Sequence, residues 1–413
     1  MAGLVIKPRT RILHGHDWVY ASDVLKAFGN PRDGDVVSLK DGKDHLIGSA
    51  IYNSRSQIVA RRFSRQRQEL DLDFFKRRIA QAVEYRARNQ TRGVNTQLCR
   101  LVWSESDGLP GVIVDRYGQT LVLQTLTLAM DQRLPIIVEA LRKILSPQTI
   151  IERNDAPIRR AEGLDLKTGV LLGEVRAIEI EALGLKFEVD PLRGHKTGFY
   201  LDQIDNYREV ARWAANRRVL DCFSNQGAFA LACAKAGARE VTAVEISADA
   251  VAQIRANAAR NGFAVEGAAP SAPLAAAGDA TARVPPIGAV AANVFDFLKQ
   301  SENSGVQFDL IVLDPPSFTK SKDKLHDALR GYKEIHLRAL KILAPGGLLA
   351  TFSCSHHVSA ELFKQVIIDA LVDAKKSARQ LATLHQSADH PILVSIPETE
   401  YLKGFLLELA PGR

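Results

Sequence analysis

Two short segments of the sequence carry residue types that could do chemistry together. In Leu313–Phe318, LDPPSF, Asp314 precedes two prolines; in Thr351–His357, TFSCSHH, Cys354 lies among polar residues. Each segment follows an apolar run typical of a buried strand, so neighbouring parallel strands would place the thiol beside the carboxylate. The two prolines restrict the backbone and remove N–H donors, which holds Asp314 at the edge of the sheet.

A thiol at such an edge indicates nucleophilic catalysis. Carbon C5 of cytosine is too electron-poor to accept a methyl group until a thiolate adds at C6. We therefore expect Cys354 to attack C6 while Asp314 assists protonation near N3. The base that removes the C5 proton is not identified by the sequence. Asp314 could instead be a capping residue before a proline turn.

The other three cysteines are expected to be inert core residues: Cys99, Cys222 and Cys233. None of the four cysteines forms a CxxC pair, so neither a zinc site nor a disulfide framework is expected, and no metal is assigned. His356 and His357 could lower the thiol pKa or cap the next helix. They are left off the catalytic set.

The loop after the first strand of the C-terminal half predicts a nucleoside cofactor. It reads DCFSNQGAF and lacks GxGxxG, which argues against a dinucleotide and favours a cofactor with a sulfonium and an amino-acid tail. S-adenosylmethionine fits this description. The candidate cofactor-binding residues of the loop are Asp221, Ser224, Asn225, Gly227 and Phe229.

Further cofactor candidates end the next two strands. Glu245 could accept hydrogen bonds from both ribose hydroxyls, or it could cap a helix, although Ser247 can supply that cap. After the third strand, an adenine would lie between apolar side chains with Asn293 at its amino edge. The apolar candidates are Ile246 and Val294.

The elements that must position these residues alternate along the C-terminal half. Seven apolar runs are separated mostly by helical patterns, which predicts a doubly wound, mainly parallel α/β sheet: RVLDCF, EVTAVEI, AVAANV, FDLIVLD, GGLLATFSCS, ILVSI and FLLEL. The Ala-, Pro- and Gly-rich stretch Ala264–Ala292 is expected to be a surface insertion.

The N-terminal half divides into a β-rich part and an α+β part. Short β-type runs with Asp-Gly turns at 33–34 and 41–42 fill residues 4–65. Residues 70–92 have helical periodicity and predict a linker helix. Residues 99–190 hold strand candidates around a helix near 132–145, which predicts a second, α+β domain.

The 413 residues predict two or three domains, and the net charge of +7 with a pI near 9.2 favours a polyanionic partner. No run is apolar enough to cross a bilayer and no signal peptide is evident, so a cytoplasmic protein without membrane contact is expected. Basic residues crowd one segment, where a solvated helix face is the favoured interpretation for any single arginine: Arg55, Arg61, Arg62, Arg65, Arg67, Lys76, Arg77, Arg78, Arg86, Arg88 and Arg92.

At these motifs the chain resembles the bacterial PUA-domain-containing large-subunit ribosomal RNA cytosine-5 methyltransferases. The resemblance runs almost end to end and includes SESDGLPGVIVDRYG, GHKTGFYLDQ and HPILVSIPETEYLKG besides the motifs above. It implies a PUA-like RNA-binding β-barrel over 1–68, a linker helix and central α+β domain over 69–190, and a Rossmann-like class I methyltransferase domain over 191–413.

The resemblance also implies site residues, a cofactor and a partner. Phe199, Tyr200 and Gln203 would lie near the methionine moiety of S-adenosylmethionine, and Asp314 would line the cofactor pocket. Cys354 matches the family's nucleophile. Asn293 departs from the family, which usually has Asp there. The implied partner is large-subunit ribosomal RNA, bound through its phosphates with a flipped target base and weakened by salt. A homodimer is compatible with the sequence.

Two other functions fit the sequence. An RNA guanine or adenine N-methyltransferase could use the same DPPSF motif and needs no thiol. A non-catalytic RNA-binding assembly factor needs only the basic N-terminal half. Methylation by a Cys354→Ala protein would separate the first from the cytosine-5 enzyme, and failure to bind S-adenosylmethionine would favour the second.

Overall fold

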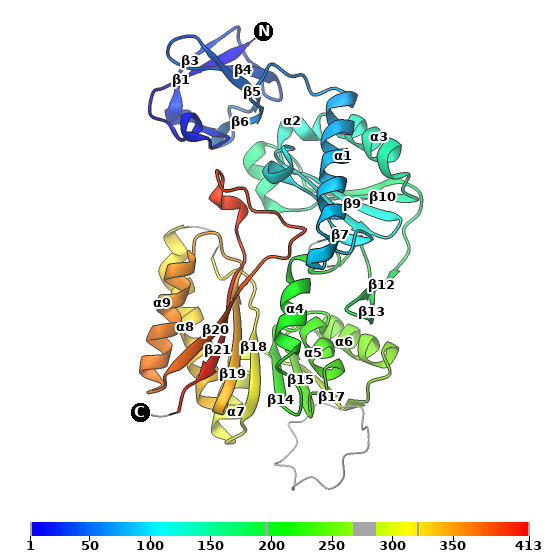
Figure 1. Cartoon of the computed structure of the whole chain (residues 1–413), viewed down its shortest axis with the longest axis vertical. Coiled ribbons are helices and arrows are strands. Elements are labelled where there is room, and N and C mark those ends of the chain that lie inside the picture. The colour runs from blue at the N-terminus through cyan, green and yellow to red at the C-terminus, as the bar shows by residue number, and fades with distance from the viewer. Residues whose placement is uncertain (1, 195–196, 267–285, 320–321, 412–413) are drawn as a thin grey trace. The chain divides into compact units, whose positions relative to one another are not determined.

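The computed structural model describes residues 2–194, 197–266, 286–319 and 322–411. The chain forms two compact units (Figure 1). The first comprises Met1–Ile180, Val189–Leu201 and Ala388–Glu400, and the second comprises Glu181–Glu188, Asp202–Ser387 and Tyr401–Arg413. The division into three domains at residues 68 and 190 stays a prediction.

The first unit begins with a six-stranded sheet in the order β2-β6-β5-β4-β1-β3, as the sequence predicted for this β-rich part. Its strands are β1 (Gly3–Ile6), β2 (Trp18–Tyr20), β3 (Val24–Phe28), β4 (Val36–Lys40), β5 (Leu46–Tyr52) and β6 (Ile58–Ser64). Alternate apolar residues fill its core, and Asp41 closes the β4–β5 turn by accepting from the amides of Lys43 and His45.

The predicted linker helix is α1 (Leu72–Arg88), capped by Asp71. It covers the apolar core of a five-stranded sheet in the order β11-β10-β9-β8-β7. That sheet and its helices are β7 (Leu98–Trp103), β8 (Val112–Tyr117), β9 (Thr120–Thr125), α2 (Leu128–Asp131), α3 (Leu134–Leu145), β10 (Thr149–Asn154) and β11 (Lys167–Leu172). A hairpin follows, β12 (Ile178–Ala182) and β13 (Leu185–Val189).

The second unit contains an eight-stranded sheet in the order β16-β17-β15-β14-β18-β19-β21-β20. Its strands are β14 (Arg218–Cys222), β15 (Glu240–Glu245), β16 (Val265–Glu266), β17 (Ile287–Ala291), β18 (Phe308–Leu313), β19 (Leu343–Ser353), β20 (Ala378–His385) and β21 (Lys403–Leu409). Its helices are α4 (Ile204–Ala211), α5 (Ala228–Lys235), α6 (Ala248–Arg260), α7 (Val294–Asn303), α8 (Leu325–Ile342) and α9 (Ala360–Asp373). Within the described sheet only β21 runs opposite to the other strands, because it pairs antiparallel with both β19 and β20, so the predicted α/β class is confirmed.

Three sequence predictions need correction. ILVSI, residues 392–396, is not a strand: it follows Pro391 in the first unit and makes one isolated bridge, Leu393 with Ile396. Strand β20 was missed because much of this edge strand is exposed and its sequence has no continuous apolar run. Strands β16 and β17 lie within the stretch Ala264–Ala292 that was expected to be an insertion, although the predicted strand AVAANV overlaps the end of β17. Residues 267–285 of that stretch lie outside the described residues.

Candidate methyl-transfer site

Four adjacent parallel strands bring the predicted catalytic and cofactor residues to one edge of the second unit. In the order β15-β14-β18-β19, Cys222 pairs with Val244 and Leu313, and Leu313 pairs with Thr351. Glu245, Asp221, Asp314 and Cys354 lie at or just beyond the carboxyl ends of these strands. The expectation that the Asp314 and Cys354 strands are neighbours is confirmed. We call these four residues the methyl-transfer edge.

In the loop after β14, every second residue has a left-handed backbone conformation. Phe223, Asn225 and Gly227 have φ values of 62°, 50° and 81°, in the left-handed region. Gly227 directly precedes α5, and a Cβ atom there would lie 2.9 Å from Leu231 Cδ1. Both the backbone and the packing therefore require glycine. Such alternation turns successive N–H groups toward one concavity, which suits an anionic group such as a carboxylate.

Asp221 ties this loop to α5 and is itself buried. Its Oδ2 accepts from Ser224 Oγ at 2.5 Å and from the Ala230 amide at 3.1 Å. The pKa of Asp221 is raised to about 7, chiefly by burial and in smaller part by the nearby carboxylates of Asp314 and Glu245. The site therefore holds several acidic groups and would be stabilised by a positively charged ligand.

Glu245 is held by the same loop. Its Oε2 accepts from the Asn225 amide at 3.0 Å and its Oε1 accepts from the Ile246 amide at 2.7 Å. The cap of α6 is Ser247, whose Oγ accepts from the Ala250 amide. The alternative in which Glu245 caps that helix is therefore wrong. Ile246 is 68% exposed, so an apolar side chain stands free beside this carboxylate.

The remaining cofactor candidates differ in their placement. Asn293 caps α7 by accepting from the Phe295 amide at 2.9 Å, and Val294 is buried in the core. Phe229 is also a core residue, with its ring 4.6 Å from that of Tyr207. Packing alone accounts for the burial of Val294 and Phe229.

Phe199 and Tyr200 belong to the first unit, whereas Gln203 belongs to the second. The Phe199 amide donates to the hydroxyl of Tyr117 at 3.1 Å. The roles of Phe199 and Tyr200 toward the cofactor stay predictions.

Gln203 connects α4 to the methyl-transfer edge. Its Nε2 donates to Asp314 Oδ2 at 2.9 Å, and its Oε1 accepts from Asn206 Nδ2 at 2.6 Å. Asn206 in turn donates to the carbonyl of His385 at 2.9 Å. This chain of amides helps to fix the orientation of the Asp314 carboxylate.

A ladder of hydroxyl groups joins the segments that carry Asp314 and Cys354. Ser317 Oγ lies 2.9 Å from Ser355 Oγ, which lies 3.0 Å from the hydroxyl of Tyr332. Ser353 Oγ donates to the same Tyr332 hydroxyl at 3.0 Å. Residues on both sides of Cys354 are thus tied to α8 and to the DPPSF loop. We call Ser317, Tyr332, Ser353 and Ser355 the hydroxyl ladder.

Cys354 differs from the other cysteines in exposure. It is partly exposed, whereas Cys99, Cys222 and Cys233 are buried, as expected. Burial raises the pKa of Cys99 to about 12 and raises the pKa of Cys222 and Cys233 well above the usual range for a thiol. Of the four thiols, only Cys354 is placed to react with a ligand.

Two features of the edge were missed in the sequence. Three partly buried aromatic residues follow β14, β17 and β18, with the Phe318 ring 6.4 Å from that of Phe223 and 6.1 Å from that of Phe295. Buried Lys403 donates to the carbonyl of Ser355 at 2.8 Å and brings a cation beside the Cys354 segment. The sequence could have predicted a role for Phe318, because it follows the two prolines in the PPSF run. It could not have predicted one for Lys403, which lies in a strand whose sequence indicates only a structural part.

The fold and the composition of the edge define a class I, S-adenosylmethionine-dependent methyltransferase. Residues 164–270 match the S-adenosylmethionine-dependent methyltransferase family, and residues 7–65 match the PUA-like domain family. Among the helices in the described ranges, none combines the length and apolarity of a membrane span.

Similar proteins identify the family. The chain is 38% identical to ribosomal RNA large subunit methyltransferase I of Aeromonas salmonicida over 98% of both chains, and 37% identical to that of Klebsiella pneumoniae (strain 342) over 95% and 94%. It belongs to the ribosomal RNA large subunit methyltransferase I family. A candidate methyltransferase solved in complex with SAH has the same fold, with a TM-score of 0.80 and 21% identity over 99% of this chain and all of the other.

Proposed function

We propose that this protein methylates C5 of a cytosine in large-subunit ribosomal RNA, with Cys354 as nucleophile and Asp314 as proton donor. The observation that carries the proposal is the placement of the one partly exposed cysteine at the end of β19, next to β18 and Asp314. Transfer of a methyl group to a ring nitrogen or an exocyclic amine would need no thiol at this position.

The residues of the edge suit S-adenosylmethionine. Its ribose hydroxyls can donate to Glu245, its adenine can lie against the exposed Ile246, and its cationic groups would offset the carboxylates that raise the pKa of Asp221. When bound, this cofactor supplies an electrophilic methyl group to C5. Asn293 would present its polar side chain to the adenine edge while it caps α7.

The chain's own residues would carry the remaining steps. The Cys354 thiolate forms a bond to C6 as the ring accepts a proton at N3 from Asp314, which makes C5 electron-rich. After C5 is methylated, the C5 proton passes to solvent, cleavage of the sulfur–C6 bond returns the thiolate, and N3 returns its proton to Asp314. Gln203 holds Asp314 in place and the hydroxyl ladder holds the segment of Cys354.

Nucleoside analysis tests the proposal. Ribosomal RNA from cells that lack the protein is methylated by the wild-type protein, by Cys354→Ala and by Cys233→Ala, a matched control from the core of the same unit, and is then digested to nucleosides for mass spectrometry. We expect 5-methylcytidine from the wild-type and control proteins and none from Cys354→Ala. A methylated guanosine or adenosine that persists in Cys354→Ala would establish the N-methyltransferase alternative.

A further inference from the structure

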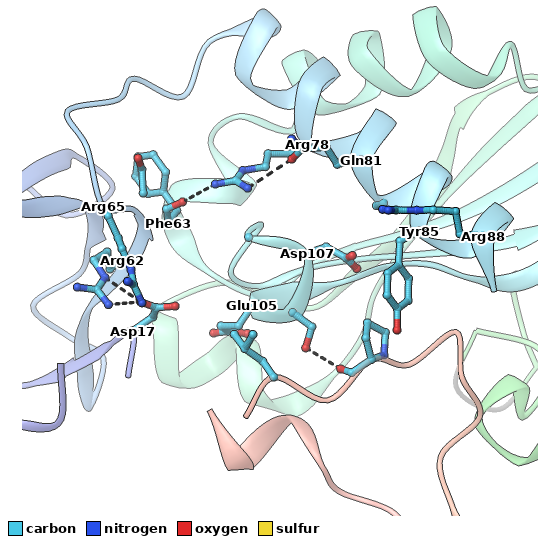
Figure 2. Close-up of a pocket in the computed structure, with 16 residues that line it drawn as sticks. Asp17, Arg62, Phe63, Arg65, Arg78, Gln81, Tyr85, Arg88, Glu105 and Asp107 are labelled. Carbon is cyan, nitrogen blue, oxygen red and sulfur yellow. Dashed lines mark hydrogen bonds and ion pairs between the residues drawn. The ribbon is translucent and has the colours of Figure 1, made fainter. Parts of the chain in front are cut away.

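A cavity of about 470 Å³ in the first unit has no part in the chemistry described above. Residues of the β-rich sheet, α1, the 3-10 turn Ser104–Asp107 and the segment after Ala388 line it. Figure 2 shows Arg65, Arg78 and Arg88 spaced around it, with Tyr85 next to Arg88. We call these four residues and the space they line the arginine cavity.

The acidic residues of the cavity are already neutralised. Asp17 pairs with Arg62 at 2.7 Å, Glu105 with Arg61 at 3.0 Å, and Asp107 with Arg86 at 2.6 Å. Arg86 is fully buried and also donates to the carbonyls of Arg100 and Asp389, so it is structural. The expectation of a solvated face is wrong for Arg62 and Arg86.

The three cavity arginines lack comparable partners. Across the described ranges no carboxylate lies within ion-pair distance of Arg65 or Arg78, and Arg88 has only the exposed Glu84 at 3.8 Å. The Arg78 guanidinium donates to the Phe63 carbonyl at 3.2 Å and lies against Gly108, where a Cβ atom would come within 3.1 Å of Arg78 Cζ. Arg78 is therefore held in a fixed, partly desolvated position.

A desolvated cation without a counter-charge is unfavourable unless an anion joins it. Burial lowers the pKa of Arg78, the direction expected for such a cation. A phosphate group offers oxygen acceptors that match the guanidinium geometry. Tyr85 beside Arg88 adds an aromatic surface on which a base can stack.

We infer that the arginine cavity binds an unpaired segment of the RNA substrate, with backbone phosphates on Arg65, Arg78 and Arg88 and a base against Tyr85. The inference rests on the proposed function for the nature of the substrate. Unpaired RNA fits better than a duplex, because the bases of a duplex are stacked on each other and cannot reach an aromatic side chain in a cavity. The cavity would anchor the RNA away from the reacting base.

Binding measurements with the full chain test the inference separately from catalysis. The probe is a fluorescent 12-nucleotide single-stranded RNA of mixed sequence, titrated without cofactor at several salt concentrations. The cavity variant is Arg65→Gln/Arg78→Gln/Arg88→Gln. The matched control is Arg92→Gln/Arg142→Gln/Arg160→Gln, which removes the same charge from exposed positions outside the cavity.

We expect the cavity variant to lose about tenfold or more in affinity and its salt slope to fall by about 2, since each phosphate contact to a single strand contributes about 0.7. The control should lose less than about threefold. Tyr85→Ala should lower the affinity for the RNA about fivefold or more. Tyr85→Phe should change the affinity little, because stacking needs only the ring. If Arg78→Gln perturbs folding, Arg65→Gln/Arg88→Gln tests the same point with exposed side chains.

Equal losses in the cavity and control variants would overturn the inference, because general charge would then explain binding. An RNA duplex that binds as tightly as the single strand, with no effect of Tyr85→Ala, would also overturn it. Polyglutamate that competes as well as the single strand would show an acidic protein as the occupant instead. Cys354→Ala should bind like wild type, so a failure of the proposed chemistry does not change this readout.

Discussion

The methyl-transfer edge and the arginine cavity hold their side chains by different means. At the edge, amides and hydroxyls orient a carboxylate and a cysteine segment through short uncharged links, such as Gln203 to Asp314 at 2.9 Å. Of the three cavity arginines, Arg88 has only the exposed Glu84 at 3.8 Å as an ion-pair partner, and Arg78 is fixed by the carbonyl of Phe63. The edge is preorganised for chemistry, whereas the cavity is suited to attract a polyanion. Substitutions at the edge should change rate, and substitutions in the cavity should change affinity.

The largest expected effect is at Cys354. Cys354→Ala should lower single-turnover methylation by about a thousandfold or more, because no other group at the edge can add to C6. RNA affinity should stay within about twofold. Cys233→Ala should keep its rate per folded molecule. Quench-flow measurements with radiolabelled methyl donor would give the methylation rates of both variants. A rate near wild type for Cys354→Ala would contradict the division of roles between the edge and the cavity.

Asp314→Asn should come next. The amide oxygen can still accept from Gln203, so the fold of the edge is kept, but the proton donor is lost. We expect a loss of about a hundredfold in single-turnover rate, in the range of general acid catalysis. Gln203→Met, which removes the hydrogen bond from Gln203 to this carboxyl group, should lose less. Equal rates for Asp314→Asn and wild type would remove Asp314 from the mechanism.

Substitutions in the arginine cavity should change the affinity for RNA and leave the rate of the chemical step unchanged. Arg78→Gln should raise the KM for RNA several-fold and leave kcat unchanged, since uniform binding is lost. Raising salt should mimic this substitution in the wild-type protein. A fall in kcat at unchanged KM would show that the cavity takes part in the chemical step.

The buried carboxylate of Asp221 predicts a dependence on pH. Because burial raises its pKa from 3.8 to about 7, the folded cofactor-free protein holds this proton more tightly than the unfolded chain. The contribution of this group to the free energy of unfolding is fully present below about pH 4 and is lost as the pH rises through about 7. A cationic cofactor favours the deprotonated form, so S-adenosylmethionine affinity should rise with pH below about 7, by at most tenfold per pH unit.

Calorimetry in buffers of different ionisation enthalpy would measure the proton released on cofactor binding. In Asp221→Asn, the amide oxygen can keep both hydrogen bonds made by Oδ2, and both the proton release and the decline of stability with pH should disappear. Proton release that persists in this variant would assign the effect to another group.

The smallest expected effect is in the hydroxyl ladder. Tyr332→Phe removes the link to Ser353 and Ser355 but keeps the ring, so we expect a several-fold lower rate and a stability loss of about 1 kcal/mol. Ser304→Ala, which removes an exposed hydroxyl of the same unit, is the control. A rate unchanged by Tyr332→Phe would show that the ladder supports the fold alone.

The sequence predicted the sheet and the edge well because buried parallel strands are continuous apolar runs whose ends carry the polar residues. The prediction from sequence failed where contacts between residues far apart in the chain determine the local structure. ILVSI reads as a strand, yet Val394 is 93% exposed. The helical pattern predicts a solvated Arg86, but its side chain is buried in the core, where the guanidinium donates to the backbone carbonyls of Arg100 and Asp389. The link from Gln203 to Asp314 spans 111 positions and has no local signal.

A covalent trap tests the central claim most directly. RNA that carries 5-fluorocytidine has no C5 proton to lose, so a sulfur–C6 adduct cannot be released after methylation. Wild-type protein incubated with this RNA and S-adenosylmethionine should form a complex that survives denaturing electrophoresis, and mass spectrometry should locate the RNA on the peptide containing Cys354. A complex that is absent, that forms equally in Cys354→Ala, or that maps to another residue would contradict the account.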